Sequence, residues 1–490
     1  MMTYVPAEIS RRMAGSEEIT VKTVLLNVAV IAPLFFVNYF GTTGNAAFFL
    51  ALVLMMAKST EHAVRALSLM YLVIVGNVAL VDTSSTLFSA GKFLFLCLVA
   101  ARLFYSLRLQ GRMLHRIPVV GSLLLFCLVA LLLALEGGYF AQVSALKLLS
   151  FLTGMVCVLA SVEAMRHRRH GLNGWFLSIA IFVMLIGLVT WAAGLGFNSK
   201  TDLTYFNRFL NGPFYHPQTL GPASALIVLW LVGFGTLTRH RLRFVALPMI
   251  AVFLVFLYMS SARTSLLAIG LAMVVSVLLL AFMRGKALRQ MLRLARHALL
   301  AGSAIGFVLT MVELIRPGTI VEPVLEFVLK RNSADLQLQA EVILYSRQSL
   351  IEMMTENIEQ NPWTGIGFGT STHSAFVNNA SLLRATTEKG VLPIAIVEET
   401  GYIGALFFLV FLLSAFVYLI RSGNILGVVG LSAMLGINMA EMNFFSFGGH
   451  GGFFWAWVMA LMLMRLDTTT LSAPSRLRSR PSQDFGVRTV

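Results

Sequence analysis

The sequence predicts an all-α polytopic membrane protein. Of its 490 residues, 58% are hydrophobic and 12% are charged, and the mean hydropathy is +0.81, whereas about 25% of the residues of a soluble domain are charged. Runs of mostly apolar residues recur along almost the whole chain. Since about 20 such residues cross a bilayer as a helix, we expect about 12 to 14 transmembrane helices and one large hydrophilic segment.

The loops between the apolar runs alternate in charge. Lys and Arg collect in every second loop, from Lys58 and Arg65 to Arg421, and cytoplasmic loops carry this excess of positive charge. The alternation predicts that both termini are cytoplasmic and that residues 316–400 lie outside. The predicted spans lie near 22–40, 44–57, 64–81, 86–105, 117–135, 144–164, 174–195, 219–237, 244–259, 264–283, 297–315, 401–420, 424–443 and 453–465.

Several kinds of partner and cofactor are not expected. The net charge of +15 is accounted for by cytoplasmic loops that face membrane lipid, so no nucleic-acid partner is needed. Cys97, Cys127 and Cys157 fall inside apolar runs, which argues against a disulfide or a metal site. The chain has no Asp-x-Asp motif, with which many sugar-nucleotide enzymes hold a divalent ion. We expect no metal and no other cofactor.

Composition divides the chain into four regions. Residues 1–315 contain the first eleven spans, residues 316–400 form a large outer loop, and residues 401–465 contain the last three spans. Residues 466–490 are rich in Ser, Pro and Arg and predict a disordered cytoplasmic tail.

The outer loop contains a predicted helix in the stretch "SRQSLIEMMTENIEQNPWTGIGFG". Leu350, Met354 and Ile358 recur at spacing four between acidic and amide residues, which is typical of an amphipathic helix on a membrane or protein surface. Pro362 ends the helix, and the glycines that follow allow a tight backbone path. The segment is therefore expected to be partly helical.

Two arginines are placed beside spans on the outer side. Arg208 precedes one span and Arg263 opens another. Each could snorkel to the interface and contact lipid headgroups. Two on the same face, next to a large outer loop, favour a pair of guanidinium groups that binds a phosphate or diphosphate bidentately.

The outer side also carries candidates for a general base. Glu398 and Glu399 precede the span at 401–420, where negative charge suits a helix N-terminus. A position at a helix N-terminus does not explain Glu388, which forms a close pair of opposite charges with Lys389. The full set of candidates is His216, His373, His450, Glu388, Glu398, Glu399 and Glu441.

Four stretches resemble the superfamily of O-antigen ligases and O-antigen polymerases, which assemble bacterial envelope glycans. "RFLNGPFYHPQTLG" (208–221) is similar to its Arg, Gly, Phe, Asn/His-Pro pattern, and "SSARTSLLAI" (260–269) to its Ser-x-Arg-Thr/Gly at a helix start. "SRQSLIEMMTENIEQNPWTGIGFG" (346–369) looks like its Ser-Arg, helix, Pro, Gly-x-Gly run, and "EETGYIGALFFLVFL" (398–412) like its Glu-x-Gly-x-x-Gly. The four stretches occur in the expected order.

The resemblance implies a GT-C-like, metal-independent, inverting glycosyltransferase in the bacterial inner membrane, with its active site facing the periplasm. Its donor would be a glycan on undecaprenyl diphosphate. Arg208 and Arg263 would hold the diphosphate leaving group. Arg347 would add to their positive electrostatic field at the diphosphate, or would only cap the loop helix. The remaining residues expected to line the substrate are His216, Gln218, Gly365, Gly367 and Lys389.

One departure from the family pattern affects the base. Family ligases usually carry a His-Asn shortly before the Glu-x-Gly, but here that region reads "ATTEKGVLPIAIVEETG". Either Glu388 accepts the proton of the acceptor hydroxyl or His373 folds back to do so, and we favour Glu388. Glu398 is a further candidate.

Three functions remain open. The first is a polymerase that joins lipid-linked repeat units of an exopolysaccharide or O-antigen, and the second is a ligase that transfers the glycan to lipid A core or another acceptor. The third is a flippase for lipid-linked oligosaccharides, although its cations should reach both faces. Other polysaccharide-assembly proteins are conceivable partners in each case.

Overall fold

The computed structural model describes residues 19–112, 117–137, 141–165, 170–195, 197–198, 209–237, 243–260, 262–282, 341–370, 390–439 and 442–464. These residues form a helical bundle. Its helices are α2 (Val21–Phe36), the 3-10 helix η1 (Val37–Phe40), α3 (Gly41–Lys58), α4 (Thr60–Ile74), α5 (Thr86–Leu109), α6 (Pro118–Gly137), α7 (Ala141–Ala164), α8 (His170–Ala192), α9 (Pro217–Leu237), α10 (Arg243–Met259), α11 (Arg263–Phe282), α14 (Glu341–Gln360), α16 (Leu392–Arg421), α17 (Ile425–Asn438) and α18 (His450–Leu463). The strands β1 (Phe197–Asn198) and β2 (Phe209–Leu210) form a small antiparallel pair.

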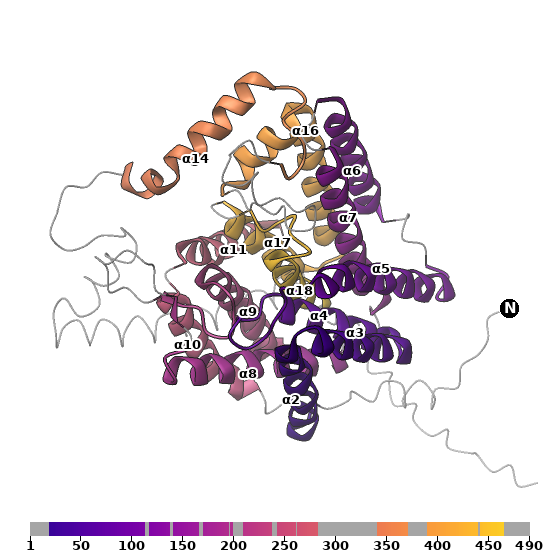
Figure 1. Cartoon of the computed structure of the whole chain (residues 1–490), viewed down its shortest axis with the longest axis vertical. Coiled ribbons are helices and arrows are strands. Elements are labelled where there is room, and N and C mark those ends of the chain that lie inside the picture. The colour runs from indigo at the N-terminus through magenta and orange to yellow at the C-terminus, as the bar shows by residue number, and fades with distance from the viewer. Residues whose placement is uncertain are drawn as a thin grey trace, which may run out of the picture.

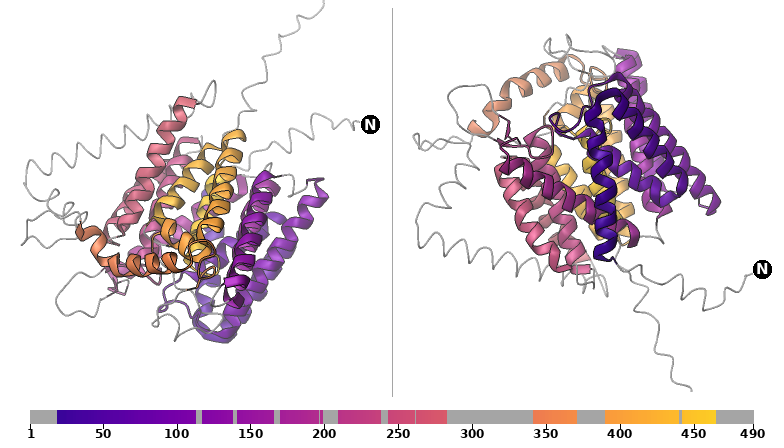
Figure 2. Two further views of the ribbon diagram at one scale, coloured as in Figure 1. Left: turned by 90° about the horizontal axis from the view of Figure 1, so that it is seen from above. Right: turned by 60° about the horizontal axis from the view of Figure 1, so that its bottom comes forward.

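Most of the helices run side by side, and α14 lies across one end of the bundle (Figures 1 and 2). We call this end the α14 face. In space, α17 and α18 occupy the middle of the bundle. The helices α9, α10 and α11 lie on one side of them, and α5, α6 and α7 lie on the other. The α14 face contains α14, which belongs to the segment that the charge alternation predicts to lie outside.

The chain is a multi-pass membrane protein. In the described part of the chain, seven helical stretches are long and apolar enough to cross a membrane, one of which, Val21–Lys58, contains both α2 and α3. Four shorter helices are also apolar. Together these stretches cover twelve of the predicted spans; the run at 297–315 lies outside the described residues.

The remaining predicted span corresponds to α4, a central helix. Its first turns carry Glu61, His62 and Arg65, but its residues from Ala63 to Val73 are almost all buried. The charged residues pair locally, because Arg65 forms a salt bridge with Glu61 and lies over the ring of Trp175. Burial among other helices rather than lipid contact explains why α4 tolerates a more polar sequence.

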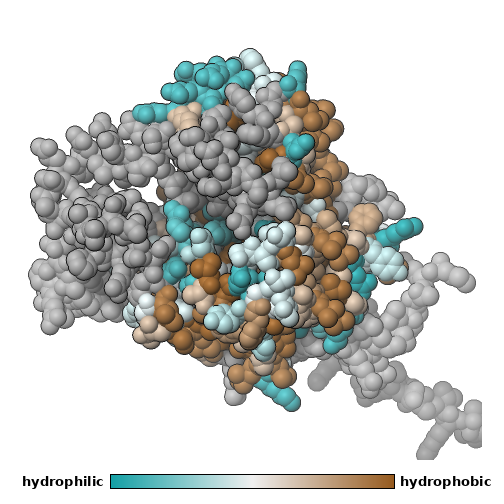
Figure 3. All heavy atoms as spheres, viewed as in Figure 1, coloured by the Kyte–Doolittle hydropathy of each residue, from teal (hydrophilic) through white to brown (hydrophobic). Residues whose placement is uncertain are grey.

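The sides of the bundle are apolar, as a lipid-facing surface requires. On α6, Leu124, Leu128, Leu132 and Leu135 are between 48% and 62% exposed, while Phe126 on the same helix is fully buried. Figure 3 shows hydrophilic side chains over α14 at the top and hydrophobic ones over the bundle beside it at the right.

The length of α16 fits a membrane crossing with recognisable ends. Tyr402 and Trp363 are 52% and 65% exposed and their rings are in edge-to-face contact at 5.9 Å, and Trp and Tyr mark membrane interfaces. From Tyr402 to Arg421 the helix rises by about 28 Å, close to the ~30 Å thickness of the hydrocarbon core.

This geometry predicts the labelling of the two ends of α16. In a variant whose three cysteines are replaced by alanine, Trp363→Cys should react in intact cells with a maleimide that cannot cross the inner membrane. Arg421→Cys should react only after permeabilisation. Labelling of both positions in intact cells would contradict a crossing between them.

Candidate functional site

A kink inside α16 is an unusual backbone feature of the α14 face. Gly401 has φ 63° and ψ −177°, which are not helical values, and only glycine adopts them easily. Glu398 and Glu399 come directly before the kink. α16 as a whole begins at Leu392, but the kink divides it: the part after Gly401 matches the span predicted at 401–420, and the two glutamates lie in the shorter part before the kink.

The kink is compensated by residues 361–370, which we call the glycine loop. In an unbroken helix the Glu398 carbonyl would accept the Tyr402 N–H. Instead, the Tyr402 N–H is donated to the Pro362 carbonyl at 2.8 Å, and the carbonyls of Glu398 and Glu399 accept the N–H groups of Ile366 and Gly367 at 2.9 and 3.1 Å. The loop thus satisfies backbone groups that the kink releases.

Two glycines make this close approach possible. A Cβ on Gly365 would lie 2.6 Å from backbone atoms of Glu399, Thr400 and Gly401, and one on Gly401 would lie 2.2 Å from the Trp363 carbonyl group. Gly365 and Gly367 have φ values of 70° and 108°. The expectation of a tight backbone path through these glycines is confirmed.

The amphipathic helix predicted before the glycine loop is also confirmed, as α14. Met354 is buried, Glu352 and Glu356 are exposed, and the helix ends at Gln360, two residues before Pro362. On its buried face, Asn357 donates from Nδ2 to Glu398 Oε1 at 2.7 Å. Glu398, 1% exposed, therefore joins α14 to α16.

Removing the Asn357 amide is expected to destabilise the protein. Asn357→Leu keeps the size of the side chain but takes a donor from a buried carboxyl group, which costs about 1 to 3 kcal/mol. The thermal unfolding temperature of the purified protein should fall. The matched control is Glu359→Gln on the exposed face of α14; equal unfolding temperatures for both variants would show that the Asn357 contact contributes nothing.

The starts of α9 and α11 lie side by side on the α14 face. Gly221 of α9 packs so closely that a Cβ there would lie 2.4 Å from the Ala262 Cβ and 2.7 Å from the Ser265 Oγ. α11 begins at Arg263, as the sequence predicts. The structure therefore brings together two of the four family-like stretches, 208–221 and 260–269.

His216 and Gln218 lie at the start of α9. The Gln218 N–H is donated to His216 Nδ1 at 3.2 Å, so the half-buried imidazole caps the helix, and Gln218 is exposed. The next residue, Thr219, is hydrogen-bonded through Oγ1 to His450 Nδ1 at 3.1 Å. This contact joins the first turns of α9 and α18.

An aromatic loop, residues 442–449, connects the two sides of the face. The rings of Phe445 and Phe368 of the glycine loop are 4.9 Å apart, and those of Phe444 and Phe408 of α16 are 5.5 Å apart. The aromatic loop leads directly into His450 and α18. The kinked helix α16 and the starts of α9 and α11 thus belong to one packed unit.

Sequence reasoning missed two lysines on this face. Lys92 donates from Nζ to the Gly448 carbonyl at 2.7 Å, and Lys147 donates to the Gly369 carbonyl. The Gly369 N–H is in turn donated to Glu399 Oε2 at 2.7 Å. A lysine near the outer end of an otherwise apolar span was the signal available for each.

The other predicted site residues are placed only in part. Arg208, His373, Glu388, Lys389 and Glu441 lie outside the described residues. Arg263 and Arg347 lie in α11 and α14, of which only the backbone is described at these positions. The proposed catalytic roles of Glu388, His373 and Glu398 stay predictions.

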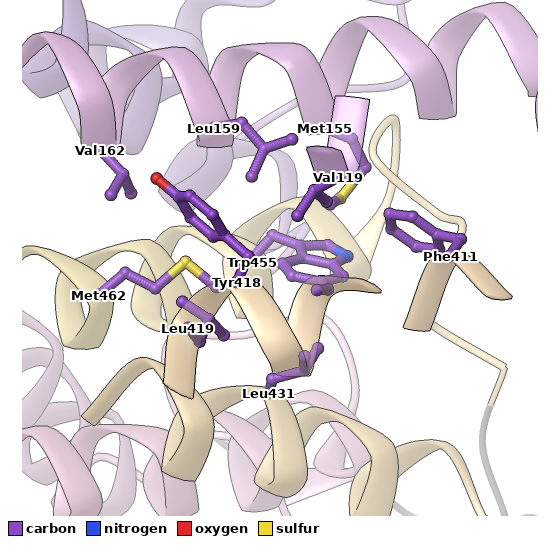
Figure 4. A pocket seen from close by; sticks show the side chains of 11 residues that line it. Val119, Met155, Leu159, Val162, Phe411, Tyr418, Leu419, Leu431, Trp455 and Met462 are labelled. Atoms are coloured by element: carbon purple, nitrogen blue, oxygen red, sulfur yellow. The ribbon is translucent and has the colours of Figure 1, made fainter. Parts of the chain in front are cut away.

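A small apolar pocket lies elsewhere, toward the opposite ends of α6, α7, α16, α17 and α18 (Figure 4). The pocket contains none of the predicted site residues, and we do not assign it a role in the chemistry. Its lining is Val119, Met155, Leu159, Val162, Phe411, Ala415, Tyr418, Leu419, Leu431, Trp455 and Met462.

No model of a known protein family matches the chain, and no curated protein is significantly similar to it. The four family-like stretches are therefore the basis of the functional proposal, together with the geometry that joins them.

Proposed function

We propose that the protein is a membrane glycosyltransferase that polymerises lipid-linked oligosaccharide repeat units at the α14 face. The donor is a glycan on undecaprenyl diphosphate, and the acceptor is a hydroxyl group on the next unit. The observation that supports this most is the adjacency of the starts of α9 and α11 at Gly221. It joins stretches that are far apart in the sequence and that each carry an outer arginine.

The proposed reaction exchanges one bond at the anomeric carbon. The acceptor oxygen forms a bond to this carbon as the bond to the diphosphate oxygen breaks, and the acceptor proton passes to a base, for which we propose Glu388. The leaving diphosphate gains negative charge, which Arg208 and Arg263 would stabilise through bidentate hydrogen bonds. The N-terminus of α11 adds partial positive charge at Arg263.

The kinked α16 and the glycine loop would hold the acceptor side of this site. Their backbone groups are fixed by four hydrogen bonds between the two segments, counting the Gly369 bond to the Glu399 side chain. Such rigidity is what a transferase needs to align two large substrates. A ligase would need the same arrangement, so the acceptor distinguishes the two enzymes.

An in vitro assay tests the proposal. Purified protein in nanodiscs receives undecaprenyl-diphosphate repeat units and EDTA, and a ladder of products is expected on a gel because no metal is needed. A single shifted band that requires lipid A core would identify a ligase instead. No product, with lipid crossing a vesicle membrane, would identify a flippase.

A further inference from the structure

Lys92 and Lys147 occupy equivalent places in two neighbouring helices. Each is the seventh residue of its helix, α5 and α7 respectively, so each lies about 9 Å below the helix start. Both are half-buried, and α5 packs against α7. A cation at this depth of a bilayer is costly unless polar groups surround it.

Each lysine donates a hydrogen bond to one of two adjacent non-helical segments. Lys92 donates to Gly448 of the aromatic loop, and Lys147 donates to Gly369 of the glycine loop. Phe445 and Phe368 bring these loops together. Non-helical backbone at membrane depth is tolerated where it is buried in protein or lines a water-filled cavity.

A glycine carbonyl only partly compensates an ammonium group. The carbonyl is neutral, whereas the ammonium carries a full charge and three donors. In the described part of the chain, the ion pairs are Arg65–Glu61 and Arg112–Glu163, neither of which involves Lys92. Lys92 Nζ also lies 5.2 Å from the centroid of the Phe93 ring. Its contacts are therefore with groups that carry no formal charge, and the local structure suits an additional anion.

The lysines lie on the other side of α18 from Arg263. α18 packs against α9 on one side and against α7 on the other, and both views of the bundle separate α5 and α7 from α9 and α11 in this way (Figures 1 and 2). The proposed polymerisation joins two substrates that each carry a diphosphate, so it requires two anion-binding places. Arg263 belongs to one of them.

We propose that Lys92 and Lys147 form a second anion-binding site, which binds a phosphate or carboxylate group of the acceptor. This inference rests on the proposed function, and it assigns the α5–α7 side to the acceptor and the α9–α11 side to the donor. The phosphate would come from the lipid carrier and the carboxylate from an acidic sugar.

Equilibrium binding to the full-length protein in phosphatidylcholine nanodiscs tests this assignment. The probes are undecaprenyl phosphate and methyl glucuronide, with methyl glucoside as the neutral comparison. The wild type should bind two molecules of undecaprenyl phosphate, and Arg263→Gln should bind one. At the second site, the double variant Lys92→Gln/Lys147→Gln should lose at least tenfold in affinity for undecaprenyl phosphate, for methyl glucuronide, or for both.

The probes distinguish the sources of the anion. If the lysine variant weakens only the binding of undecaprenyl phosphate, the lysines bind the carrier; if it weakens only the binding of methyl glucuronide, they bind an acidic sugar. Either result supports the second site. Methyl glucoside should not show a lysine-dependent difference.

Charge-preserving and distant variants make the test specific. Lys92→Arg/Lys147→Arg should bind within threefold of the wild type, and Lys58→Gln at the far end of α3 should bind like the wild type. Unchanged binding in the glutamine variant would overturn the inference, as would an equal loss in the arginine variant, because the lysines would then only fasten the loops. An unchanged Arg263→Gln would instead count against the proposed donor site.

Discussion

An Arg263→Gln variant is expected to form polymer at least about 100-fold more slowly than the wild type, a loss typical of removing one group that stabilises a developing negative charge. Glutamine keeps a polar side chain but lacks the charge and the bidentate fork of the guanidinium group. Because Arg263 is the first residue of α11, the substitution leaves the helix itself intact. The rate is measured with purified protein and undecaprenyl-diphosphate repeat units.

Two further arginine variants make this result interpretable. Arg263→Lys should be intermediate, because lysine keeps the charge but not the planar geometry. Arg421→Gln removes an exposed arginine from the far end of α16 and should leave the rate unchanged. Wild-type polymer formation by Arg263→Gln, at equal protein levels, would remove Arg263 from the proposed donor site.

Gly401→Ala is expected to destabilise the protein by about 3 kcal/mol or more, because it combines backbone strain with steric overlap. The new Cβ would lie 2.2 Å from the carbonyl group of Trp363, which is backbone and cannot rotate away. Separating the glycine loop from α16 would also break the hydrogen bonds to Glu398 and Glu399. Gly365→Ala meets the same backbone from the other side and should behave alike.

Two other glycines serve as controls. Gly423 has φ +65° but no atom within 4 Å of its Cβ position, so Gly423→Ala should show the cost of strain alone, about 1 kcal/mol. Gly270 lies in α11 with open space around it, so Gly270→Ala should be neutral or slightly stabilising. Detergent-solubilised variants are compared by thermal unfolding; a Gly401→Ala variant no less stable than Gly423→Ala would contradict the close packing.

The crossing segments could be predicted from the sequence because their requirements are local. A helix in lipid satisfies its own backbone hydrogen bonds and needs only enough apolar residues. The long apolar runs of α6 and α8 are therefore enough to predict two membrane-crossing helices. The amphipathic spacing in α14 and the position of Arg263 at a helix start are equally local. The run at 64–81 was predicted to be a span, but the helix found there, α4, is Thr60–Ile74 and is not among the described helices that are long and apolar enough to cross a membrane.

The site could be predicted only as a set of residue types on one face. Sequence reasoning placed Glu398, Glu399 and the glycines of residues 365–367 on the outer side, but it could not show that the glutamate carbonyls bind the glycine loop. Nor could it start α16 at Leu392, since the kink at Gly401 is stable only because the loop satisfies the broken hydrogen bonds.

By itself, then, the sequence determined the membrane class and the position of most of the apolar helices. Only the tertiary structure decided which residues of the candidate site meet: Gly221 with the start of α11, Asn357 with Glu398, and Lys92 and Lys147 with the glycines of two loops. The reason is that burial in lipid depends on the composition of a single helix, whereas each of these contacts depends on which helices pack together, and residues far apart in the chain set that choice.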